Sequence, residues 1–114
     1  VIVENCTTGR EGGGIQMKHA GPIMNNVLLI NNSTTQANPA DCQGDHLTDR
    51  CKGGGLYIDQ GTDAMDTPVV IDGITMIGNN AEDGAGMYIK DWGGSYILLS
   101  NFIIYLSNYF NLHF

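Results

Sequence analysis

Apolar and polar residues alternate in three short stretches of the chain, and each stretch directly follows a glycine-rich triplet. In residues 15–18, 56–59 and 87–90, an apolar residue, an outward residue, a second apolar residue and a charged residue follow in that order. Such a period of two is typical of a half-buried β-strand. The preceding triplets are Gly12-Gly13-Gly14, Gly53-Gly54-Gly55 and Gly84-Ala85-Gly86. Because glycine permits positive φ angles and close backbone approach, each triplet predicts a tight corner that launches a strand.

A second apolar strand follows each of these units and leads into polar residues. These strands are predicted at residues 27–30, 69–71 and 96–99, with polar turns at 31–34, 72–73 and 100–101, and residues 1–3 match the same strand of a preceding coil. Asn, Asp, Ser and Gly favour turns because their side chains bond the backbone or tolerate left-handed geometry. The pattern therefore predicts a short array of repeating units.

One such unit cannot bury its apolar face alone, whereas stacked units bury a continuous core. Stacking forms two inward columns, Ile15–Leu56–Met87 and Met17–Ile58–Ile89. Equivalent residues lie over one another when the stacked strands are parallel. The sequence therefore predicts an all-β fold, a right-handed parallel β-helix of about three to four coils. A β-sandwich built of hairpins is the rival fold.

The predicted domain is a single β-helix segment over residues 1–114. Because the step between the first two triplets is longer than the next step, a loop insertion is expected at about residues 36–52. Residues 100–114 are rich in aromatic and aliphatic side chains, and they are expected to form a truncated last coil or a buried cap. Polar residues interrupt this tail, so it does not supply the ~20 apolar residues of a transmembrane helix.

Charge narrows the choice of partners. The formal net charge is −7 with only five basic residues, scattered along the chain. Nucleic acids and anionic membranes need clustered Lys and Arg, so neither is an expected partner. No signal peptide is present in this stretch of sequence, yet the cysteines described below favour an oxidising compartment, so the expected location is extracellular or at a cell surface.

Residues 69–81 (VVIDGITMIGNNA) and 84–89 (GAGMYI) resemble the pectin-lyase-like right-handed β-helix superfamily. The nearest style is that of the non-catalytic coils of polymorphic outer-membrane adhesins and related surface proteins, and the resemblance covers the chain to about Leu99. It implies an architecture more than a function, because the fold carries lyases, hydrolases, epimerases and adhesins. The motifs Asn-Thr-Asp, Asp-Asp and Gly-His-Gly of the enzyme branches do not occur in this sequence, and neither does the Arg-x-Pro-x-x-Arg pattern of the pectate-lyase type. No catalytic residue and no cofactor is therefore assigned.

The alternation also predicts an outward face that could contact a ligand. Its two rows, with one added aromatic residue, are Gln16–Tyr57–Tyr88, Lys18–Asp59–Lys90 and Trp92. The functional interpretation is an aromatic and charged stripe that stacks on the sugar rings of a polysaccharide or cell-surface glycan. The structural interpretation is cross-strand stacking beside a column of alternating charge, with each pair contributing about 0.2–1 kcal/mol.

The insertion holds Cys42 and Cys51, which are expected to form a disulfide. Free thiols are one alternative, and a zinc site that includes His46 is another, although the spacing matches no standard zinc pattern. Cys6 is interpreted as a buried structural thiol or as a cysteine whose partner lies beyond this sequence. Asp63, Asp66 and neighbouring acids are read as solvated loop residues rather than a calcium site, so no metal is assigned.

The favoured hypothesis is a non-enzymatic β-helix segment of a secreted or surface protein that serves in adhesion or carbohydrate binding. Its other partners would be further coils of a longer chain. The alternative is a fragment of a polysaccharide-active lyase or glycoside hydrolase with its catalytic residues elsewhere. A plain spacer stalk is the third hypothesis.

Overall fold

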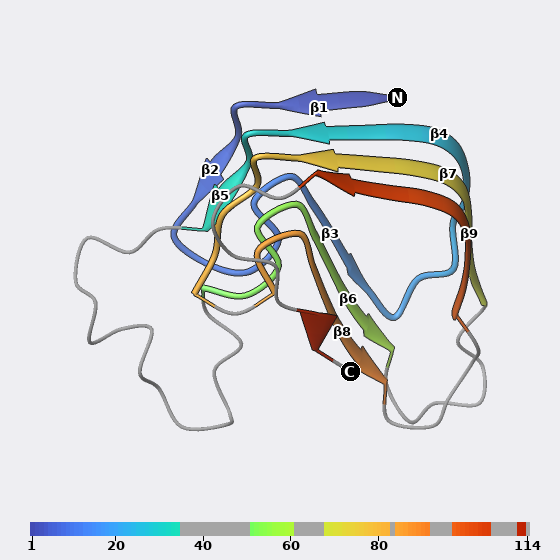
Figure 1. Cartoon of the computed structure of the whole chain (residues 1–114). Coiled ribbons are helices and arrows are strands. Elements are labelled where there is room, and N and C mark those ends of the chain that lie inside the picture. Colours follow the sequence, from blue (N-terminus) through green and yellow to red (C-terminus); the bar gives the residue numbers. More distant parts are fainter. Residues whose placement is uncertain (35–50, 61–67, 83, 92–96, 106–111, 114) are drawn as a thin grey trace.

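The computed structural model describes residues 1–34, 51–60, 68–82, 84–91, 97–105 and 112–113 (Figure 1). Every regular element in these residues is a β-strand. The strands are β1 (Ile2–Glu4), β2 (Thr7–Thr8), β3 (Ile15–Lys18), β4 (Ile23–Ile30), β5 (Ser33–Thr34), β6 (Leu56–Gln60), β7 (Val69–Ile77), β8 (Met87–Asp91), β9 (Ile97–Tyr105) and β10 (Leu112–His113).

All strand pairs in the described residues are parallel, and they build three sheets. The β4 sheet has the order β1-β4-β7-β9, the β6 sheet has the order β3-β6-β8-β10, and a short sheet pairs β2 with β5. The chain visits each sheet in turn, so that each coil lies against the previous one (Figure 1). The predicted parallel β-helix is therefore confirmed. The hairpin sandwich is wrong, because it requires antiparallel pairs.

The predicted register of the glycine–strand units is also confirmed. Ile15 pairs with Leu56 and Leu56 with Met87, while Ile58 lies between Met17 and Ile89. These side chains join aliphatic residues of the β4 sheet in one core. The buried core residues are Met17, Val27, Leu29, Leu56, Ile58, Val69, Ile71, Ile74, Met76, Met87 and Ile89. Each full burial of such a side chain stabilises the fold by about 1.5–3 kcal/mol.

The strands of the β4 sheet are longer than the sequence predicts, because they bend where a turn was expected. Asp72-Gly73 lies inside β7 and Ser100-Asn101 lies inside β9. One residue in each of β4, β7 and β9 is left out of the strand pairing, and these residues are Asn26, Gly73 and Asn101. Their φ angles are positive, at 52°, 80° and 52°. Because the left-handed residue stands at the same level in all three strands, the strands bend together and their register continues beyond the bend. Residues 100–105 of the expected tail consequently belong to β9.

The exposed carboxylate of Asp72 ties this bend to the next coil. The Asn101 side-chain amide and the Ser100 hydroxyl donate hydrogen bonds to Asp72 Oδ1 at 2.7 and 3.0 Å. Both bonds favour the charged form, so they lower the pKa of Asp72 below its ordinary value of 3.8.

Two buried asparagines support the corner between the β4 sheet and the short sheet. Asn32 and Asn79 occupy the same position in successive coils, and Asn79 Oδ1 accepts bonds from the backbone and side-chain amides of Asn32 at 2.9 and 3.0 Å. The two side-chain amides donate to the carbonyls of Val3 and Leu29 at 3.0 and 2.9 Å. Because these polar groups are buried, their mutual bonds avoid the cost of unsatisfied donors and acceptors.

The glycine triplets are needed because backbone packs against backbone at this corner. A Cβ atom on Gly13 would lie 2.4 Å from the carbonyl oxygen of Gly54 in the next coil and 2.7 Å from the carbonyl of Ser33. A Cβ atom on Gly54 would lie 2.4 Å from the carbonyl oxygens of both Ala85 and Asn80. The triplets thus allow the β6 sheet to start directly beside the short sheet.

Candidate functional site

The candidate ligand-contact face lies on the outer side of the β6 sheet, and the structure aligns its residues as expected. Gln16, Tyr57 and Tyr88 are level with one another in β3, β6 and β8. Two positions further along the same strands, Lys18, Asp59 and Lys90 are also level with one another. Trp92, the last residue assigned to this face, lies outside the described residues.

The two tyrosines of this row are covered and stacked, which favours the structural interpretation of cross-strand stacking over an open aromatic stripe. Tyr57 is 0% exposed and Tyr88 is 5% exposed, whereas Gln16 is exposed. The two tyrosine rings stack with 5.6 Å between centroids and an interplanar angle of 5°. Alternation fixes the side of the sheet that a side chain leaves, but it does not fix whether that side is covered. The rings are therefore used for packing between coils, and they offer no open platform for a sugar.

Two lysines cover these rings. Lys18 Nζ lies 5.7 Å from the centroid of the Tyr57 ring, and Lys52 Nζ lies 4.8 Å from that of Tyr88. Lys52 Nζ also donates a hydrogen bond to the Tyr88 hydroxyl at 3.2 Å. Ammonium groups at this range are attracted to the face of an aromatic ring. Each tyrosine is thus held by its neighbour ring and by a cation.

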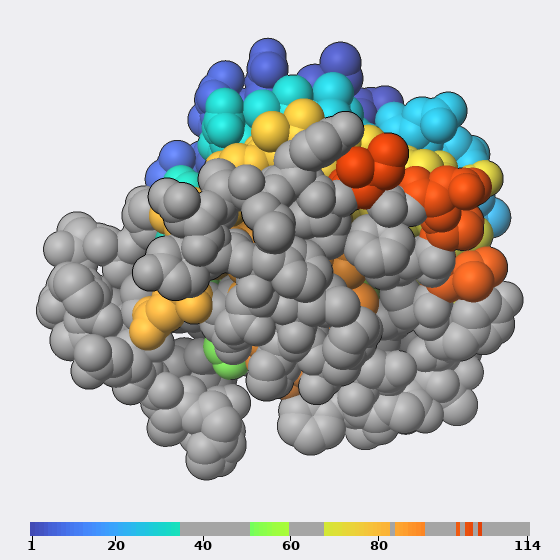
Figure 2. Space-filling view, viewed as in Figure 1, coloured from blue at the N-terminus to red at the C-terminus, as the bar shows by residue number. Residues whose placement is uncertain are grey.

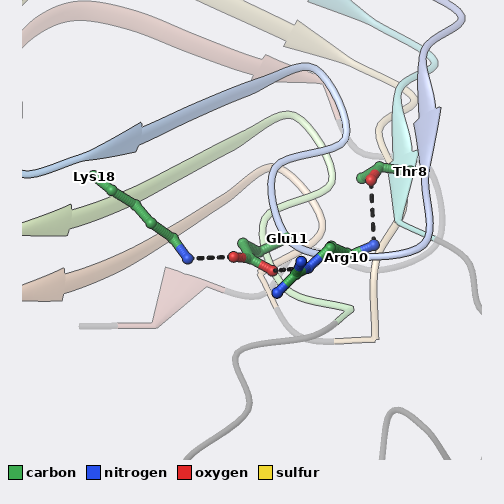
Figure 3. A network of polar contacts seen from close by, with 4 residues as sticks. All are labelled: Thr8, Arg10, Glu11 and Lys18. Atoms are coloured by element: carbon green, nitrogen blue, oxygen red, sulfur yellow. Dashed lines mark hydrogen bonds and ion pairs between the residues drawn. The ribbon is translucent and has the colours of Figure 1, made fainter.

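A charged network at the first glycine corner is the main polar feature of this region (Figure 3). Lys18 Nζ donates to Glu11 Oε1, and Arg10 Nε lies 3.8 Å from Glu11 Oε2. The Glu11 side chain is only 5% exposed, against 42% for Lys18 and 74% for Arg10. Thr8 Oγ1 accepts the backbone amide of Arg10 at 3.2 Å, which fixes the approach to the corner.

Burial and charge act in opposite directions on Glu11. Burial raises the pKa of its carboxyl. The bond from Lys18, a bond from its own backbone amide, and the charges of Lys18 and Arg10 outweigh burial and hold that pKa below the ordinary 4.5. Glu11 is therefore an ionised partner for cations and is unsuited to act as a general acid near neutral pH.

The sequence contains a signal for this network, although Glu11 does not belong to the predicted ligand-contact face. Each glycine–strand unit starts and ends with opposite charges, in the pairs Glu11/Lys18, Lys52/Asp59 and Asp83/Lys90. Glu11 and Lys18 form an ion pair, and Asp83 lies outside the described residues. Beside the charge column predicted for Lys18, Asp59 and Lys90, Glu11 and Lys52 are therefore level at the start of the first two corners.

Of the three cysteines, Cys6 and Cys51 lie among the described residues. Cys42 and the alternative zinc ligand His46 lie outside the described residues, so the disulfide with Cys51 stays a prediction. Cys51 is 1% exposed and has a positive φ of 63°. Cys6 carries an exposed thiol, so its interpretation as a buried thiol is wrong. It replaces asparagine at the position of Asn32 and Asn79, at the outer end of their ladder, where its amide donates to Asn32 Oδ1 at 3.0 Å.

The outer face of the β4 sheet has a different chemistry. Ile23, Leu98 and Ile103 are 77%, 51% and 51% exposed there, and none of the four strands in this sheet carries Lys or Arg. Atoms of β1, β4 and β7 form successive layers along the upper part of the molecule in Figure 2. This face offers aliphatic contact, whereas the β6 sheet offers charge.

Within the described ranges, no three His, Cys, Asp or Glu side chains gather closely enough to hold a metal ion. The same residues include no helix with the length and apolar character needed to cross a membrane. Asp63, Asp66 and the side chain of Asp91 fall outside the described part. Comparison of the chain with protein-family models, curated proteins and solved structures finds no match.

Proposed function

We propose that this chain is a coil segment of a non-enzymatic scaffold in a secreted or cell-surface protein, where it serves adhesion or carbohydrate binding. The finer fold assignment, to the pectin-lyase-like right-handed β-helix group, is part of the same proposal. The observation that carries it is the alignment of Lys18, Asp59 and Lys90 along one end of the β6 sheet. Because neighbouring strands lie about 4.8 Å apart, these three charged side chains are held at a fixed spacing. A surface that binds an extended ligand requires such a spacing.

Burial of the two tyrosines changes how such a ligand would be bound. Sugar rings would meet the side chains of Gln16, Lys18, Asp59 and Lys90 through hydrogen bonds and charge, without stacking on Tyr57 or Tyr88. Uronate or sulfated glycans fit this row best, because two of its three charged members are cationic.

A glycan array probed with the purified chain tests the proposal. Lys90→Gln should weaken binding of an acidic glycan about tenfold, since a charged hydrogen bond contributes about 1.5–3 kcal/mol. Arg10→Gln is the matched control, because it removes one exposed cation at the corner and leaves the row intact. Equal losses in the two variants would show only non-specific charge attraction.

Turnover separates the alternatives. Cleavage of uronate or neutral polysaccharides by the chain or by a longer protein that contains it would favour the polysaccharide-active enzyme. A lack of both binding and turnover would favour the spacer stalk.

A further inference from the structure

The charges that bracket each glycine–strand unit change sign from one coil to the next. The residue before the triplet is Glu11, then Lys52, then Asp83, and the residue after the strand is Lys18, then Asp59, then Lys90. In the sequence, every unit therefore begins and ends with opposite charges, and each of these charges is opposite in sign to its equivalent in the next unit. With only five basic residues in the chain, three of them stand in these two columns.

The structure gives this pattern its geometry. Lys18, Asp59 and Lys90 are level in three parallel strands. The amides of Gly12 and Gly13 donate to the carbonyls of Lys52 and Gly53 at 3.0 Å, so Glu11 is level with Lys52 in the next coil. Opposite charges in adjacent strands are favourable and like charges are unfavourable. The columns thus favour one order of neighbours over the reverse.

Glycine imposes a second, independent condition. A Cβ atom on Gly13 or Gly14 would lie 2.4 or 2.7 Å from a carbonyl oxygen of the following coil, at Gly54 or Gly55. The relation repeats one coil later, where a Cβ atom on Gly54 would lie 2.4 Å from the carbonyl of Ala85. A strand that stacks in front of β3 would meet the carbonyls of Gly13 and Gly14 in the same way, so it too needs glycine there.

β3 is the edge strand of the β6 sheet among the described residues. The stacking rule is that the triplet amides of one coil donate to the carbonyls of the next, as Gly13 does to Gly53. At this edge the triplet of β3 therefore presents carbonyl acceptors to an incoming strand. Glu11 and Lys18 end the two charge columns at the same edge.

We propose that the edge of β3 binds a further coil of defined sequence pattern, namely basic residue, three glycines, apolar, any residue, apolar, acidic residue. Its basic residue lies over Glu11 and its acidic residue lies over Lys18, while its glycines lie over the first triplet. This pairing rests on the proposed scaffold role only in that both require coils to stack. Residues 52–59 (KGGGLYID) already have the required pattern, whereas residues 11–18 (EGGGIQMK) have the reversed charges.

A tethered strand tests this pairing on the whole chain. The peptide KGGGLYID is fused ahead of Val1 through a flexible Gly/Ser linker as long as residues 19–27, the segment that joins Lys18 to the partner of Ile2. Tethering raises the local concentration enough to reveal a weak strand addition. The readout is protection of the peptide glycine amides from hydrogen exchange, because these amides would donate to the carbonyls of the first triplet.

The matched controls differ in charge order or in glycine content. EGGGLYIK keeps the glycines and the apolar residues but has an acidic residue first and a basic residue last. KGAALYID keeps the charges of KGGGLYID but adds two Cβ atoms at the second and third glycine positions. We expect the glycine amides of KGGGLYID to be protected about tenfold more than those of EGGGLYIK. The reason is that EGGGLYIK replaces two attractive charge pairs, with Glu11 and with Lys18, by two repulsive ones. KGAALYID should show no protection.

The variant Glu11→Gln/Lys18→Gln removes both charges of the edge without changing the net charge. On this background, KGGGLYID and EGGGLYIK should be protected equally. Equal protection on the unmodified chain, or a difference that survives the double variant, overturns the proposal. Sedimentation that shows the untethered chain pairing with itself through this edge also overturns it, because the occupant would then be a second copy. None of these readouts involves a glycan, so failure here and failure of the proposed function are distinguishable.

Discussion

At the scale of single residues, Glu11 illustrates how this acidic chain uses a charge inside its structure. Its carboxylate is almost fully covered, yet it stays ionised because Lys18 and Arg10 supply compensating charge. Removing one partner of a covered pair leaves the other charge poorly compensated, which is the usual source of destabilisation in such pairs. Lys18 remains 42% exposed, so solvent screens the pair and limits its contribution to about 1 kcal/mol.

Glu11→Gln should therefore lower the free energy of unfolding at pH 7 by about 1 kcal/mol. The folded-state pKa of Glu11 lies below its ordinary value of 4.5, so its contribution is fully present above that pH. The contribution is lost as pH falls through the lowered folded-state pKa, because the Glu11 carboxyl is then protonated in both the folded and the unfolded state. Urea unfolding from pH 7 to pH 3 should show the two proteins converging at the acid end.

Glu82→Gln is the control for this pH series, because it also removes one carboxylate and its side chain is exposed. It should change the free energy of unfolding little at any pH. A constant difference between wild type and Glu11→Gln across the series would show that the effect comes from packing and not from ionisation.

At the scale of structural elements, the glycine corners decide whether the β6 sheet can form. Gly54 packs against the backbone of two neighbouring segments, with hypothetical Cβ contacts of 2.4 Å to Ala85 and Asn80 oxygens. A backbone oxygen cannot move aside as a flexible side chain can. The same corner position in the next coil is Ala85, which is itself buried.

Gly54→Ala should consequently destabilise the chain by roughly 3 kcal/mol, the upper part of the range for overpacking. Ala85→Gly is the matched control, and it should cost only about 0.5–1 kcal/mol through backbone entropy. Thermal unfolding followed by circular dichroism measures both. A Gly54→Ala variant as stable as Ala85→Gly would mean that the corner relaxes without cost.

Much of the element pattern could be predicted from sequence, because the repeat itself carries it. The glycine triplets locate the corners, and alternation places Met17, Ile58 and Ile89 in the core. Bends such as the one at Gly73 could not be separated from turns, because glycine, Asn and Asp favour both. The burial of Tyr57 could not be predicted from the sequence either, because alternation gives the side of the sheet but not whether that side is covered. The bond between Asn32 and Asn79 joins different coils, so it follows only once the register is known.

At the scale of the whole molecule, each coil contacts chiefly the coils before and after it. Stability in such a solenoid is approximately the sum of coil terms and interfaces between neighbours, so a long excursion within one coil weakens the link at that point. The insertion predicted at residues 36–52 falls between β5 and β6 in the sequence, and residues 35–50 lie outside the part of the chain that the structure describes. Its end at Cys51 is well anchored, because Cys51 is buried and its amide donates to the Arg10 carbonyl at 3.3 Å.

A disulfide between Cys42 and Cys51 would reduce the entropy of this excursion in the unfolded chain and add about 2–3 kcal/mol to the stability of the whole molecule. We expect one titratable thiol per chain in denaturant, from Cys6, and three after reduction. Reduction should also lower the midpoint of thermal unfolding by about 10 °C, given the usual relation between free energy and midpoint for a chain of this size. Cys6→Ser removes the background thiol without touching the bridge, so the titration should then give none before reduction and two after it. Two thiols in unreduced, denatured Cys6→Ser would show that both cysteines of the insertion are free.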